Sequence, residues 1–68
     1  MQITLAAARV NAGLTQEEVA NDMKISRATL SGWEKGKTQI GVAELDYLSR
    51  KYSIPIDCFL LPSQSTDS

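Results

Sequence analysis

The stretch at residues 14–36, LTQEEVANDMKISRATLSGWEKG, limits the possible folds of this chain more than any other part of it. It carries two helix-start signals. Thr15 stands three residues before Glu18, the spacing of a capping box, and Ser26 begins a second helical pattern that Gly36 ends. Only the dipeptide KI remains for the turn between them. Helices joined this tightly cannot lie antiparallel along their lengths and must cross steeply.

Both helices have an apolar side with the 3.6-residue period of a helix. The apolar positions are Leu14, Val19, Ala20, Met23, Leu30 and Trp33. This spacing assigns Trp33 to the core rather than to a base-stacking platform. The outward side of the second helix, residues 26–35, consists of Arg27, Ala28, Ser31 and Gly32. A steeply crossed pair that leaves one polar helix face outside is the helix-turn-helix arrangement.

Helical patterns extend on both sides of this pair. Residues 5–12 form one helix before it, and apolar positions at helical spacing predict a fourth over 42–52. A proline suits the first turn of a fifth, very short helix over 56–61, and no segment is long enough for a sheet-forming strand. We therefore expect an all-α fold: a compact five-helix domain over residues 1–62, followed by a disordered polar tail at 63–68.

The formal net charge of −1 argues at first against a nucleic-acid partner, but the charges are unevenly distributed. Lys24, Arg27, Lys35 and Lys37 fall within fourteen positions, where only Glu34 opposes them. A local basic face can contact phosphates even when the whole chain is slightly acidic. We expect a basic surface along the second helix of the pair and only modest non-specific affinity for nucleic acid.

The composition argues against several other classes. One cysteine, Cys58, and no histidine leave no internal disulfide and no ligand set for zinc, so we expect neither a metal nor a cofactor. The sequence contains no signal-peptide pattern and no apolar stretch of transmembrane length, which predicts a cytoplasmic protein without a membrane partner. Without histidine, a recognisable carboxylate pair or a phosphate-binding glycine loop, we do not expect an enzyme.

Three blocks in this order resemble the lambda-repressor and Cro-like helix-turn-helix family, the XRE-type regulators. They are Arg9, then GLTQEEVA at residues 13–20, then ISRATLSGWEKGK at residues 25–37. The resemblance runs over residues 5–61, nearly the whole chain. It implies a lambda-repressor-like domain whose second and third helices form the helix-turn-helix. It also implies a sequence-specific module for double-stranded DNA, usually dimeric, that regulates transcription.

The resemblance also implies roles for particular residues. Gln16 matches a position that contacts a backbone phosphate, helped by the positive end of its helix. Arg9 and Glu34 match an ion pair that ties the first helix to the end of the third. The expected DNA-contacting residues are Gln16, Ser26, Arg27, Ala28, Ser31, Gly32, Lys35, Lys37, Thr38 and Gln39.

The chain departs from the family pattern at three positions. Lys24 stands where the family often has the turn glycine, so the turn must hold a residue with a side chain. Ile40 replaces a common proline in the loop before the fourth helix. Gly32 occupies a position where many relatives place a base-reading side chain. We therefore expect this recognition helix to read fewer bases directly.

Two interpretations stay open for most of these residues. The fork of Arg27 can bond guanine O6 and N7 together, or it can hold a phosphate, which adds affinity without sequence choice. Ala28 either touches a thymine methyl or merely permits close approach. The residues after the helix, 35–39, either clasp phosphate or form a solvated loop.

Apolar residues near the C-terminus exceed what one small core needs. They are Ile54, Ile56, Phe59, Leu60 and Leu61. Some can form a two-fold interface, and the others can complete the monomer's core. A two-fold dimer would place two recognition helices about 34 Å apart on a palindromic site.

These observations favour a small dimeric repressor that occludes a promoter. An antitoxin that represses its own operon is a closely related alternative, and a neighbouring toxin gene would identify it. A third alternative is a protein-binding module that uses the same fold, with a toxin or an anti-repressor as partner. Failure to bind DNA at low salt would favour that module.

Overall fold

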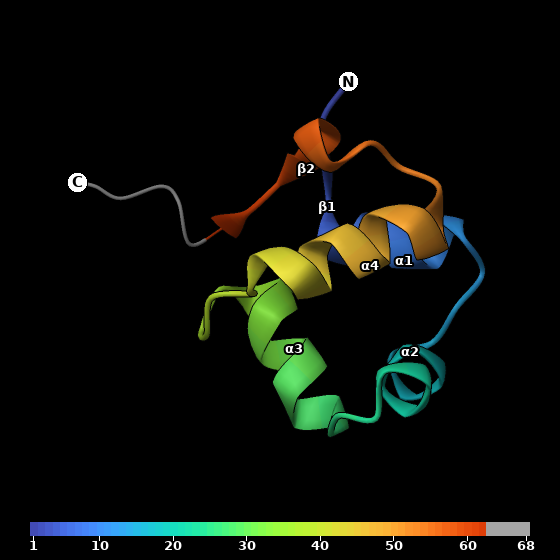
Figure 1. The fold of residues 1–68 in the computed structure, drawn as a ribbon, viewed down its shortest axis with the longest axis vertical. Coiled ribbons are helices and arrows are strands. Elements are labelled where there is room, and N and C mark those ends of the chain that lie inside the picture. The colour runs from blue at the N-terminus through green and yellow to red at the C-terminus, as the bar shows by residue number, and fades with distance from the viewer. Residues whose placement is uncertain (63–68) are drawn as a thin grey trace.

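The structure, a computed structural model, describes residues 1–62 of the chain. Four α-helices make up most of it (Figure 1). The elements in chain order are β1 (Ile3–Thr4), α1 (Leu5–Asn11), α2 (Gln16–Met23), α3 (Arg27–Lys35), α4 (Val42–Tyr52), a single 3₁₀ turn (Ile56–Cys58) and β2 (Phe59–Leu60). The expected polar tail at 63–68 lies outside the described residues.

Hydroxyl side chains cap the starts of the first three helices. The Thr4 hydroxyl accepts a hydrogen bond from the backbone N–H of Ala7 at 3.1 Å. Thr15 and Glu18 form the predicted capping box: Thr15 Oγ1 accepts from the Glu18 N–H at 3.1 Å, and Glu18 Oε1 accepts from the Thr15 N–H at 2.8 Å. The Ser26 hydroxyl caps α3 by accepting a hydrogen bond from the N–H of Thr29. These side chains satisfy donors that a helix N-terminus leaves open, so the helix starts are set locally.

The predicted turn between α2 and α3 is confirmed. Lys24 adopts the left-handed conformation, with φ 59° and ψ 42°, and the N–H of Ile25 donates to the carbonyl of Ala20 at 3.0 Å. Figure 1 shows α2 nearly end-on while α3 runs across the view, so the two helices cross steeply. Ala20, a small residue that is 2% exposed, lets them approach closely.

One hydrophobic core joins all four helices. Its buried residues are Leu5, Ala8, Val19, Leu30, Ile40, Leu48, Tyr52, Ile54 and Phe59. The half-buried Trp33 packs against this cluster, so its predicted place in the core is confirmed. Because the core holds the inner faces of α2 and α3, the outer face of α3 is presented to solvent in a fixed orientation.

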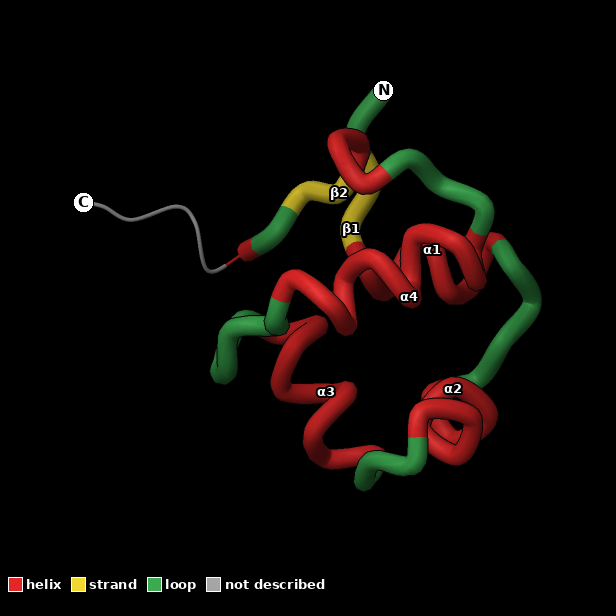
Figure 2. Tube along the Cα trace, in the orientation of Figure 1, coloured by secondary structure: helices red, strands yellow, loops and turns green. Residues whose placement is uncertain are grey.

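The predicted fifth helix is wrong. A 3₁₀ turn at Ile56–Cys58 gives way to β2, which pairs in parallel with β1 (Figure 2): Ile3 lies opposite Phe59 and Thr4 opposite Leu60. An isolated helix of six residues is too short to be stable, because nucleation fixes several residues for one hydrogen bond. Pairing with β1 satisfies the backbone instead and lets Phe59 enter the core. The expectation that no segment is long enough for a sheet-forming strand is also wrong, because β1 and β2 pair over only two residues each.

Candidate nucleic-acid interface

A hydrogen-bonded ion pair connects α1 to the end of α3. The guanidinium of Arg9 donates to the Glu34 carboxylate through Nε at 2.8 Å and through Nη2 at 3.3 Å. Its Nη1 donates to the carbonyl of Leu14 at 2.9 Å. The side chains of Arg9 and Glu34 are 13% and 5% exposed. The hydrogen bond to Glu34 raises the pKa of Arg9 above its ordinary value, so the guanidinium stays charged.

Gln16 joins this ion pair. Its side-chain Nε2 donates to Glu34 Oε1 at 2.9 Å, so Glu34 holds α1, the first residue of α2 and its own helix α3 together. The phosphate role predicted for Gln16 did not include this bond, because the two residues are 18 positions apart and no local pattern connects them. One amide N–H is engaged, which leaves the second N–H and the carbonyl oxygen of Gln16 for a ligand.

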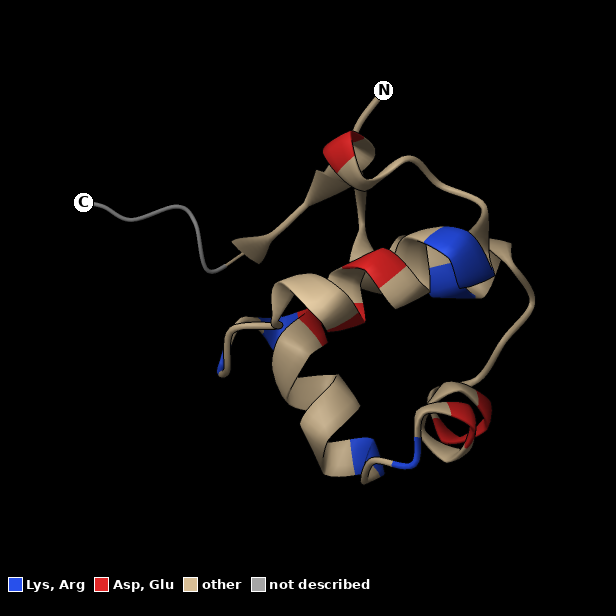
Figure 3. Cartoon of the chain, in the orientation of Figure 1, with Lys and Arg blue, Asp and Glu red and all other residues tan. Residues whose placement is uncertain are grey.

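The ion pair also changes the charge of the surface. Glu34 was the one acidic residue set against the cluster of four cations, and Arg9 neutralises it. None of the four cations pairs with Glu34, and all of them are exposed: Lys24, Arg27, Lys35 and Lys37. Figure 3 shows blue segments at both ends of α3. The basic surface expected along this helix is therefore present.

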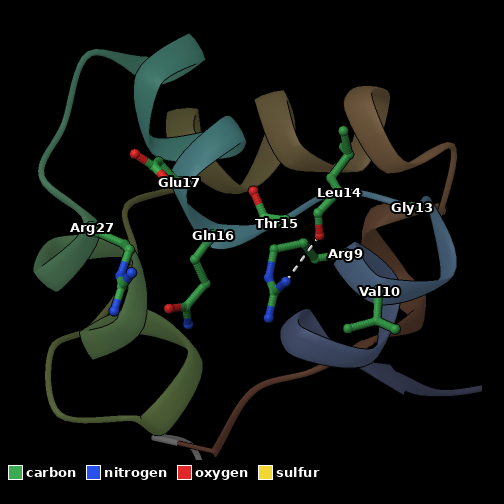
Figure 4. A pocket seen from close by; sticks show the side chains of 8 residues that line it. All are labelled: Arg9, Val10, Gly13, Leu14, Thr15, Gln16, Glu17 and Arg27. Atoms are coloured by element: carbon green, nitrogen blue, oxygen red, sulfur yellow. Dashed lines mark hydrogen bonds between the residues drawn. The ribbon is translucent and has the colours of Figure 1, made fainter.

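Arg27 and Gln16 line one open depression of about 670 Å³, between the start of α3 and the start of α2. Figure 4 shows the side chains of Arg27, Gln16 and Arg9 in a row, with their polar ends toward the same side. Thr15 and Glu17 also border this depression. An anion here would meet the Arg27 guanidinium and the positive end of α2, whereas the Glu17 carboxylate weakens the attraction.

The outward side of α3 carries small side chains that project little from the helix. Ala28 is exposed, whereas Ser31 and Gly32 are half-buried. Ser26 is exposed, but its hydroxyl is occupied at the helix start by the N–H of Thr29 at 3.1 Å and by the Thr29 hydroxyl at 2.9 Å. The structure thus gives Ser26 a capping role beside its predicted DNA contact.

The residues after α3 fold back against it. Gly36 ends the helix in the left-handed conformation with φ 79°, and the N–H groups of Lys37 and Thr38 both donate to the carbonyl of Gly32, at 2.9 and 3.3 Å. Lys35, Lys37, Thr38 and Gln39 are exposed. A second open depression, about 540 Å³, lies between this loop and α3 and is lined by Ala28, Thr29, Gly32, Trp33, Lys37, Thr38 and Gln39.

The predicted residues therefore form one surface, which we call the α3 face. It consists of the start of α2, the outward side of α3 and the loop at 37–39. A helix of nine residues is about 13 Å long, so roughly this distance separates the exposed cations near its two ends.

The five candidates for a two-fold interface divide into two groups. Ile54 and Phe59 are 9% and 8% exposed and belong to the monomer's core, so they cannot form an interface. Ile56 and Leu60 are 37% and 48% exposed, and Leu61 is half-buried. Only these last three remain available to a second copy.

Residues 1–62 hold neither a metal-ligating cluster nor a membrane-spanning helix. No cluster of three or more potential metal-ligating side chains occurs there. No helix in this part of the chain combines the length and the apolar character that crossing a bilayer requires.

Comparison with known proteins agrees with this geometry. The helix-turn-helix family model matches residues 5–57, which include α1 to α4. The HTH-type transcriptional activator BcrR of Enterococcus faecalis is 37% identical over 49 residues, covering 72% of this chain and 24% of that relative. The chain thus spans about a quarter of that relative's length. No solved structure gives a significant match. With its capped helix pair, left-handed turn and family match over most of its length, the chain belongs to the XRE-type helix-turn-helix family of DNA-binding transcription regulators.

Proposed function

We propose that the chain is a sequence-specific DNA-binding module that regulates transcription by placing α3 in the major groove. The observation that carries the proposal is the α3 face, where four exposed cations surround a shallow helix surface and their acidic neighbour Glu34 is neutralised. A helix side with small side chains allows close approach to base edges, and the cations beside it can pair with phosphates. The proposed ligand is double-stranded DNA, and the proposed location of the protein is the cytoplasm.

Arg27 is the residue we assign to direct base reading. It is exposed at the first position of α3, the end of a recognition helix that contacts base edges in this fold class. A guanidinium can bond both acceptors of guanine, O6 and N7. Gln16, in the neighbouring depression, is assigned to a phosphate through its free amide atoms and the positive end of α2.

We further propose that two copies act together on a palindrome. Ile56, Leu60 and Leu61 offer an apolar patch at the far end of the sequence from the helix-turn-helix. A two-fold axis through this patch would repeat α3 at a spacing of about 34 Å, one turn of DNA.

The sign of regulation depends on where the site lies. A site that overlaps a promoter excludes polymerase, and repression of this kind is the mode we propose. A site upstream of a promoter would instead permit activation, the activity named for the Enterococcus faecalis relative. A promoter–reporter assay with the selected site at each position distinguishes the two modes.

The first test is selection of binding sites from random duplex DNA, followed by salt titrations on the winning site and on a scrambled one. We expect an inverted repeat, and we expect Arg27→Ala to lose preference for it. Arg50→Ala, which removes an exposed cation from α4, is the matched control and should keep the preference. Each phosphate contact should contribute about −0.9 to the slope of log affinity against log salt. Equal, weak binding to both duplexes would refute the proposal and favour a protein-binding module.

A further inference from the structure

Gly32 lies on the outward side of α3, one helical turn after the exposed Ala28. A side chain there would point toward the same ligand as Ala28. The space is already taken, however. A Cβ built on Gly32 would lie 2.7 Å from Thr38 Oγ1 and 3.9 Å from Thr38 Cβ, and the first distance is far inside van der Waals contact. Thr38 thus occupies the position into which a residue-32 side chain would project.

The backbone holds Thr38 at this position. The carbonyl of Gly32 accepts hydrogen bonds from the N–H groups of both Lys37 and Thr38, at 2.9 and 3.3 Å. The left-handed Gly36 supplies the reversal that brings the loop back. These two hydrogen bonds therefore connect the loop to α3 at Gly32, the residue that the Thr38 side chain covers.

The Thr38 side chain is available to a ligand. The residue is exposed, and its hydroxyl makes no hydrogen bond within the part of the chain that the structure describes. A threonine offers one donor, two acceptor lone pairs and a methyl group. Threonine hydroxyls bond base edges, and threonine methyls contact the methyl of thymine.

We propose that Thr38, a loop residue, determines specificity at the base pair that a residue-32 side chain would otherwise read. The inference rests on the proposed function, because it requires α3 to lie in the major groove. The absence of a side chain at Gly32 then does not leave a gap in the reading surface. Gly32 makes room, and Thr38 supplies the functional group from the loop. The resulting base-reading set is Arg27, Ala28 and Thr38.

The alternative for Thr38 is a phosphate contact, and the two assignments predict different measurements. A base contact changes the preference among base pairs at one position of each half-site. A phosphate contact weakens binding to all sequences equally and lowers the salt slope by about one contact.

The test is binding-site selection with the wild type, Thr38→Val and Thr38→Ser, together with affinities for the winning site and its single-base variants. Valine keeps the shape and removes the hydroxyl, and serine keeps the hydroxyl and removes the methyl. We expect at least one of the two variants to change the preference at a single position of each half-site by roughly 3- to 10-fold, the range of one hydrogen bond or methyl contact. Lys37→Ala, in the same loop, is the control and should weaken all sequences alike.

Gly32→Ala provides an independent check. The added Cβ must displace Thr38, so we expect the preference to change at the same base pair. In a Thr38→Ala background the clash is absent, so Gly32→Ala should have much less effect, a non-additivity that a double-mutant cycle measures. Thermal unfolding of each variant confirms that the domain remains folded.

Each outcome is decisive. A wild-type site with unchanged preferences in both Thr38 variants, or a uniform loss on all sequences, would overturn the assignment of Thr38 while leaving the proposed function standing. If the wild type selects no site at all, the proposed function fails and this inference fails with it. A change confined to one base pair, repeated in both half-sites, supports both.

Discussion

Replacing Glu34 by alanine tests the ion pair that holds the helix-turn-helix to α1. The substitution removes the carboxylate that accepts two N–H groups from Arg9 and one from Gln16. Arg9 then keeps its bond to the Leu14 carbonyl but stays largely buried, with 13% of its side chain exposed, and has no counter-charge. An unpaired buried charge is the costly result of removing one partner from such a pair.

The expected magnitude follows from this burial. Removing one partner of a buried ion pair costs about 3–5 kcal/mol, and the bond that Arg9 retains places this case at about 3 kcal/mol. A domain of this size has only about 3–10 kcal/mol of total stability. Since about 1 kcal/mol shifts the midpoint of such a domain by roughly 4–8 °C, the thermal midpoint should fall by roughly 12–24 °C.

Thermal unfolding followed by circular dichroism measures this shift. Asp46→Ala is the matched control, because it removes a carboxylate from the exposed pair with Arg50, whose partners are 53% and 80% exposed. Such a pair contributes about 0.3–0.5 kcal/mol, so the control should lower the midpoint by no more than about 4 °C. A Glu34→Ala midpoint as close to wild type as that of the control would refute the assignment of a structural role to this pair.

Three further changes test separate parts of the account. Lys24→Gly should raise the stability by about 0.5–1 kcal/mol, because glycine adopts the observed φ of 59° without a Cβ penalty; a lower thermal midpoint would contradict this. Burial raises the pKa of Tyr52 from 10.0 to about 12, so the unfolded chain loses this proton first. Stability that is fully present below pH 10 should therefore fall by about 2 kcal/mol by pH 12. Tyr52→Phe should remove that loss. It should leave the stability at neutral pH equal or higher, because the Tyr52 hydroxyl is buried without a hydrogen-bond partner in residues 1–62. The control Tyr47→Phe should retain the loss, and alkaline denaturation of the two variants compares them. Arg27→Ala should weaken specific DNA binding by roughly 5- to 150-fold with an unchanged thermal midpoint, whereas an equal loss of fold stability would show that Arg27 is structural.

Local chemistry made the helix pair predictable. A hydroxyl at Thr15 with Glu18 three residues later satisfies its own helix start, and Gly36 can end a helix wherever the chain goes next. These signals act within a few residues, so the sequence alone was sufficient to place α2, the turn and α3. The family resemblance added the pairing of Arg9 with Glu34, which spacing could not provide because the two residues are 25 positions apart.

What the sequence did not predict depends on distant partners. The segment at Phe59–Leu60 is extended only because Ile3–Thr4 lies beside it, and neither two-residue strand has a pattern of its own. Helical spacing also could not separate the buried Phe59 from the exposed Leu60. Likewise, the position of Thr38 beside Gly32 depends on the path of the loop, so the sequence could not show that the Thr38 side chain fills the space next to this glycine.

The most direct test of DNA binding by the α3 face is to map the DNA-contacting residues by NMR. The ¹⁵N-labelled 68-residue chain would be titrated with the selected duplex, and backbone amide shifts would be followed residue by residue. We predict shift changes concentrated at residues 15–17, 26–32 and 35–39, with the outer side of α4 little affected. Changes concentrated on α4, with the α3 face unperturbed, would contradict it.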